Sequence, residues 1–79
     1  MGLAASEAEL VDKARRFIKA ELKRADVTYE QLAERLKEHG LVETKASIAN
    51  KLSRGTIGAA FLLATLAALE MEGVRLADL

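Results

Sequence analysis

One stretch of this sequence, residues 27–55, constrains the fold most, because it carries start and stop signals for two short helices in succession. Thr28 and Gln31 have the spacing of a capping box, in which each side chain accepts a hydrogen bond from the backbone N–H group of the other residue. The pattern predicts a helix that begins after Thr28 and ends near residues 39–40. Gly40 is suited to the left-handed conformation that closes many helices. The apolar side of this helix is predicted to consist of Leu32, Ala33 and Leu36.

A second helix is predicted to begin after Thr44, whose hydroxyl can accept from free N–H groups of the first turn. Gly55 is expected to end it. Ile48 and Leu52 are four residues apart, so they lie on one side of this helix and are predicted to face the core. The remaining surface is polar and consists of Ser47, Asn50, Lys51 and Arg54.

Another helix is predicted upstream, where Ser6 and Glu9 form a capping box. Its apolar positions recur at helical spacing: they are Leu10, Ala14, Phe17, Ile18 and Leu22.

The opposite side of this first helix is basic. Its cations are Arg15, Arg16, Lys19 and Lys23. We interpret this side mainly as the solvated face of an amphipathic helix. The alternative is a surface that faces phosphates.

The last predicted helix covers residues 58–71 and is apolar nearly all round. Leu62, Leu66 and Leu69 form one stripe, with Phe61 beside it. A helix this apolar is either central to the fold or part of an interface. Its second face is a candidate dimer interface and consists of small residues edged by a methionine: Ala60, Ala64, Ala67, Ala68 and Met71.

Composition supports one small all-α domain over residues 1–79. The chain has 79 residues, of which 51% are hydrophobic, and it contains neither proline nor cysteine. The N-terminal segment lacks the basic and apolar regions of a signal peptide, and residues 58–69 are too few to span a bilayer. We therefore expect a cytoplasmic protein without a membrane partner.

No catalytic constellation is visible, so we expect the chain not to be an enzyme. It lacks a cysteine nucleophile and a glycine-rich phosphate loop. The single histidine, His39, has no second ligand at helical spacing, and its place at a helix C-terminus gives it a structural explanation. We predict no metal, no cofactor and no small-molecule substrate.

The polar side of the helix at residues 44–54 is typical of a helix that reads the major groove of DNA. The formal net charge is zero, but positive charge is concentrated in residues 13–24 and 43–57. The side chains predicted to face bases are Ser47, Asn50 and Lys51. Tyr29, Thr44, Arg54 and Thr56 are predicted to contact the DNA backbone.

The chain resembles the lambda-repressor-like (Cro-type) helix-turn-helix family. The resemblance lies in residues 28–34, in Thr44, Ser47 and Ile48, in the Ser-Arg-Gly of residues 53–55, and in the pattern of residues 61–79. The whole chain is most similar to a small bacterial family of unknown function. Relative to the usual spacing of that family, residues 39–43 are extra, so either the first motif helix or the turn after it is longer. The resemblance implies a compact four- to five-helix fold.

We therefore expect a DNA-binding transcriptional regulator that associates with the nucleoid and binds as a homodimer, because two copies can read two half-sites. The alternative is a protein–protein interaction module on the same fold that does not bind DNA. Zero net charge and the long turn favour this alternative.

Overall fold

The computed structural model describes residues 6–79 of the chain and is all-helical. Its elements are α1 (Glu7–Ala25), α2 (Tyr29–Lys37), α3 (Lys45–Arg54), α4 (Ala59–Ala68) and a short 3-10 helix, η1 (Leu76–Asp78). The first five residues of the predicted domain lie outside the described residues. The all-α fold predicted from the sequence is confirmed. None of the helices in residues 6–79 combines the length and the apolar character needed to cross a membrane.

Helices α1, α2 and α3 begin where the sequence predicts, because each start is capped by a side chain that is close in the sequence. Ser6 accepts a hydrogen bond from the backbone of Glu9. Thr28 and Gln31 form the expected capping box at the start of α2. Gly40, with φ 81°, adopts the left-handed conformation, although α2 itself ends slightly earlier than predicted, at Lys37.

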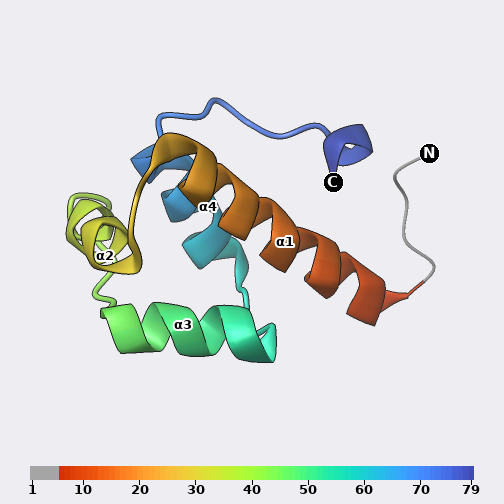
Figure 1. Ribbon diagram of the computed structural model, residues 1–79, viewed down its shortest axis with the longest axis horizontal. Helices are drawn as coiled ribbons and strands as arrows, with labels where there is room; N and C mark the ends of the chain where they lie inside the picture. Colours follow the sequence, from red (N-terminus) through yellow and green to blue (C-terminus); the bar gives the residue numbers. More distant parts are fainter. Residues whose placement is uncertain (1–5) are drawn as a thin grey trace.

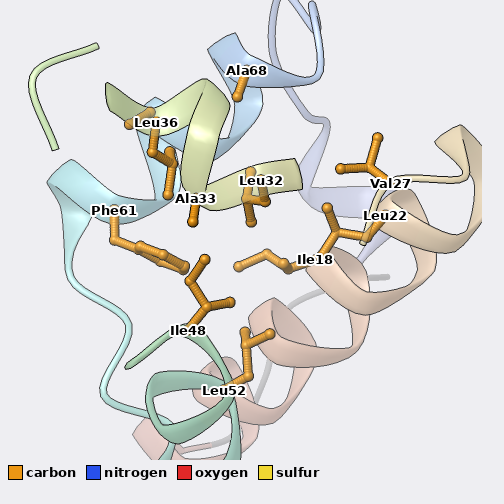
Figure 2. Packing of buried hydrophobic residues seen from close by; sticks show 11 residues of the cluster. Ile18, Leu22, Val27, Leu32, Ala33, Leu36, Ile48, Leu52, Phe61 and Ala68 are labelled. Carbon is orange, nitrogen blue, oxygen red and sulfur yellow. The ribbon is translucent and has the colours of Figure 1, made fainter. Parts of the chain in front are cut away.

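One hydrophobic core joins the four helices. Figure 2 shows apolar side chains from α1, α2, α3 and α4 converging on a single centre. The side chains that are almost completely buried include Ile18, Leu32, Leu36, Ile48 and Leu52. Since each of the four α-helices contributes to the same core, the orientation of α3 is set by its packing in that core.

Helix α4 ends at Ala68, three residues before the predicted end at Met71. Glu70 adopts a left-handed backbone with φ 60°. The N–H group of Met71 donates to the carbonyl of Leu66, at 2.9 Å, which closes the helix in the manner of a Schellman motif. This end could not be predicted from the residue types, because glutamate rarely takes that conformation.

Candidate nucleic-acid interface

Helix α3 has one side buried and one side open. In Figure 1 it runs along one edge of the molecule, with the other helices on the same side of it. Ile48 and Leu52 point into the core and are 0% and 1% exposed. Asn50 and Arg54 are exposed on the opposite side. Neither has a side-chain hydrogen bond or ion pair with another residue in the described part of the chain.

The first turn of α3 is fixed by a capping box. The backbone N–H of Ser47 donates to Thr44 Oγ1 at 3.0 Å, and the backbone N–H of Thr44 donates to Ser47 Oγ at 2.8 Å. Both hydroxyls therefore serve the helix start, although both residues were predicted to contact DNA. The sequence identified Thr44 as the cap but not Ser47 as its reciprocal partner.

Glu43 holds two of the three side chains that were predicted to face bases. Its Oε1 atom accepts a hydrogen bond from Ser47 Oγ at 2.6 Å, and its Oε2 atom lies 3.6 Å from Lys51 Nζ. The Lys51 ammonium also lies 5.8 Å from the centre of the Phe61 ring, within the range of a cation–π contact. Ser47 and Lys51 are thus engaged within the chain, and Asn50 is the open member of the predicted set.

Positive charge on α3 is uneven as a result. The ammonium of Lys45 lies 3.6 Å from a carboxylate oxygen of Glu30, so both lysines of the helix are paired with glutamates. Arg54 is the cation of α3 that has no ion pair within residues 6–79. The open positive charge therefore lies at the C-terminal end of the helix.

Helix α1 holds this C-terminal end in place. Arg15 Nη1 donates to the carbonyls of Leu52, at 3.4 Å, and Ser53, at 3.2 Å. This is a correction to the sequence interpretation, which placed Arg15 on a solvated face. Its side chain is 29% exposed, and it satisfies carbonyls that have no partner within α3. Arg16, Lys19 and Lys23 are exposed as expected.

An acid on α1 orients the same arginine. Asp12 Oδ1 lies 2.7 Å from Arg15 Nη2, and Asp12 Oδ2 lies 2.9 Å from Arg16 Nη2. The hydrogen bond from Arg15 is the main reason that the pKa of Asp12 lies below its ordinary value, and the charges of Arg16, Arg15 and Lys19 lower it further.

A glycine allows close contact between α1 and the end of α3. Gly55 ends α3, as predicted, with a left-handed backbone of φ 72°, and the next N–H group donates to Lys51 O at 3.0 Å. A β-carbon at position 55 would lie 2.5 Å from Val11 Cγ1. Glycine is therefore required at this position for two reasons: its backbone is left-handed, and α1 leaves no room for a side chain.

The other residues predicted to contact the DNA backbone are scattered. The ring of Tyr29 is half-buried and packs against the core at the start of α2. Thr56 is exposed just beyond the C-terminal end of α3. The structure therefore brings Arg54 and Thr56 to one end of α3, while Thr44 and Ser47 lie at the other end.

Only part of the candidate dimer face on α4 is exposed, because some of its residues are buried in the core. Ala64 and Ala68 are buried, at 8% and 6% exposure, so they are removed from the predicted interface. Ala60 and Ala67 are exposed. Leu63, which the sequence interpretation passed over, is 64% exposed and lies on the same side of the helix.

Met71, the last member of that predicted face, lies elsewhere. It is half-buried and lines an open cavity of about 920 Å³ between α1 and the C-terminal segment. Phe17 and Val74 also line this cavity. Lys13 Nζ donates to the backbone oxygen of Leu79 at 3.2 Å and links the two walls.

Comparison with known protein families matches residues 10–74 to a family described as a domain of unknown function, DUF6471. The chain belongs to this family. The matched part of the DUF6471 domain contains α2, α3 and α4 completely, together with most of α1. It therefore includes Glu43 and every predicted DNA-contacting residue. Comparison with curated proteins and with solved structures gives no match.

Two residues of the candidate site in this DUF6471 domain, Glu43 and Arg15, were not identified from the sequence. Glu43 lies in the turn before the cap of α3, so its contacts with Ser47 and Lys51 depend on the path of that turn and helical spacing does not indicate them. The contact of Arg15 with α3 had no signal either, because the two lie far apart in the sequence. Residues 6–79 contain no group of three or more histidine, cysteine, aspartate or glutamate side chains placed to hold a metal ion.

Proposed function

We propose that this DUF6471 domain binds duplex DNA through α3, as a lambda-repressor-like helix-turn-helix regulator of transcription. The observation that carries the proposal is the pair Asn50 and Arg54. They are exposed one helical turn apart, opposite the buried Ile48 and Leu52. A helix of this kind can enter the major groove, where asparagine pairs with adenine and arginine with guanine or phosphate.

The contacts of α3 change the roles that the sequence suggested. Asn50 is the main candidate for reading bases, and Arg54 with Thr56 is suited to hold the DNA backbone at the C-terminal end of the helix. Ser47 and Lys51 can reach DNA only after they leave Glu43. Thr44 and Tyr29 are left with weaker roles, since the Thr44 hydroxyl caps α3 and the Tyr29 ring packs on the core.

The test is fluorescence anisotropy with a mixed-sequence duplex at low and moderate salt. Binding should weaken as salt rises, because each phosphate contact releases counterions. We expect Arg54→Ala to weaken binding about fivefold or more. Arg24→Ala is the matched control, because Arg24 is exposed on α1 and already pairs with Glu21 at 2.8 Å. Absence of binding at low salt, or equal losses in both variants, would contradict the proposal.

The proposal includes a homodimer, because a domain with one reading helix contacts few base pairs. The exposed side of α4 is the proposed interface, with Leu63 at its centre and Ala60 and Ala67 beside it. Sedimentation should show a dimer for the parent chain and a monomer for Leu63→Glu. A parent chain that stays monomeric at high concentration would remove this part of the proposal.

A second candidate function is a protein–protein interaction module. It is favoured by the exposure of large apolar side chains, of which Val42 at 88% and Leu63 at 64% are the most exposed in residues 6–79. The two candidates are separated by the DNA titration. A chain that dimerises but does not bind DNA at low salt would support the module.

A further inference from the structure

We propose that Glu43 is a specificity-determining residue that suppresses sequence-independent binding of DNA. The inference rests on the proposed function, because it concerns how α3 would meet DNA. Its basis is the position of the Glu43 carboxylate, which binds Ser47 and Lys51 on the helix that is proposed to enter the groove.

The Glu43 carboxylate is held in place by contacts on both of its oxygens. Its two oxygens have different partners: Oε1 accepts from Ser47 Oγ at 2.6 Å, and Oε2 faces Lys51 Nζ at 3.6 Å. The Glu43 side chain is only 12% exposed, and that of Lys51 is 34% exposed. This pair is therefore shielded from water more than an ordinary surface ion pair, whose effect is small.

Lys51 is also held from a second direction. Its ammonium lies 5.8 Å from the centre of the Phe61 ring on α4. The side chain is thus folded back between Glu43 and Phe61. To reach a phosphate, Lys51 must exchange one anionic partner for another, so it adds little to the general attraction between α3 and DNA.

Glu43 acts on binding in two ways. It withdraws the charge of Lys51, and it places a negative charge beside α3. Both effects weaken contacts with phosphates, which are the same on every sequence. Asn50 remains open to read bases. A lower sequence-independent affinity raises the ratio of specific to nonspecific binding, which is the quantity that selects a site in a genome.

The sharpest variant is Glu43→Gln, because glutamine keeps the shape and can still accept from Ser47 but carries no charge. On a mixed-sequence duplex it should bind about three- to fivefold tighter than the parent chain. The slope of log K against log salt should become steeper by about one, since Lys51 is freed to contact one more phosphate. Circular dichroism should be used to check that the variant is folded, and Glu43→Ala serves as a second variant.

Two controls separate this effect from a general change in charge. Glu72→Gln removes one negative charge from the C-terminal segment, on the side of the molecule away from α3 (Figure 1), and should change affinity less than about twofold. In a Lys51→Ala background, Glu43→Gln should lose the part of its gain that acts through Lys51, including the steeper salt slope, and keep only the part that comes from removing the negative charge beside α3.

The outcomes distinguish this inference from the proposed function. If the parent chain binds DNA and Glu43→Gln binds with the same affinity and salt slope, the role of Glu43 is wrong while DNA binding stands. If Glu43→Gln raises affinity equally with and without Lys51, the role of Glu43 through Lys51 is likewise wrong, while DNA binding stands. If neither the parent chain nor Glu43→Gln binds at low salt, the proposed function fails, and the inference fails with it.

Discussion

The Nη1 atom of Arg15 lies 3.2 Å from the carbonyl oxygen of Ser53 and joins α1 to the last turn of α3. This contact places a cation at a helix C-terminus, where the backbone dipole favours positive charge. It also satisfies a carbonyl that the helix itself leaves free. Arg15 therefore helps to set the orientation in which α3 presents Asn50 and Arg54.

Removal of this contact should weaken the fold. We expect Arg15→Ala to lower the free energy of unfolding by about 1–2 kcal/mol, because hydrogen bonds from a charged donor are lost at a partly buried site. Arg16→Ala is the control. Its side chain is 70% exposed and pairs with the same Asp12, so it should cost less than about 0.5 kcal/mol. Urea unfolding measures both losses, and losses of similar size would contradict the role of Arg15 in holding α3.

Asp12 should report the position of Arg15 through its titration. The pKa of this carboxyl is lowered from 3.8, so its charged form stabilises the fold above the pKa of the unfolded chain. That contribution is lost as pH falls through the lower pKa of the folded chain. In an NMR titration, Arg15→Ala should raise the pKa of Asp12 toward 3.8. An unchanged pKa would mean that Arg15 is not the main cause of the shift.

Substitutions at three glycines distinguish the cost of a left-handed backbone from the cost of a steric clash with a neighbouring side chain. Gly40→Ala should destabilise the fold by about 1 kcal/mol, because φ is 81° but no atom lies near its added β-carbon. Gly55→Ala should cost clearly more, about 2 kcal/mol or above, since it adds the contact with Val11 at 2.5 Å. Gly73→Ala, which meets neither obstacle, should be neutral or slightly stabilising. Thermal unfolding gives this order, and equal costs at positions 40 and 55 would refute the role of Val11.

A buried hydroxyl on α4 offers a stabilising substitution. Thr65 is 1% exposed, and its Oγ1 atom has no hydrogen-bond partner within the described residues. Thr65→Val should therefore be neutral or stabilise the fold by up to about 1 kcal/mol. Thr44→Val removes a hydroxyl that caps α3 and should cost about 1 kcal/mol. A loss at position 65 as large as that at position 44 would show that the Thr65 hydroxyl has a partner.

The parts of the fold that the sequence predicted well are local. The predictions that depend on residues within a few positions of one another are the caps at Thr28 and Thr44, the left-handed Gly40, the helix end at Gly55, and the buried pair Ile48 and Leu52. Helix α4 was harder, because it is apolar on every side and periodicity cannot say which face is buried. Only packing against the other helices decides that Ala64 is inside and Leu63 outside.

The candidate site was predicted in outline only. Helical spacing correctly placed Asn50 and Arg54 on the open side of α3. It did not reveal that Ser47 and Lys51 have partners, because their availability depends on the path of the turn that carries Glu43. The contact of Arg15 with α3 depends on the packing of two helices that are distant in sequence.

The most direct test of DNA binding by α3 is an NMR titration of the ¹⁵N-labelled chain with a mixed-sequence duplex at low salt. We expect shifts concentrated in the backbone amides of residues 44–56 and in the side-chain amide of Asn50. The C-terminal segment, residues 71–79, should change little. Absence of shifts, or shifts confined to the basic side of α1 and the C-terminal segment, would contradict the claim that α3 binds DNA.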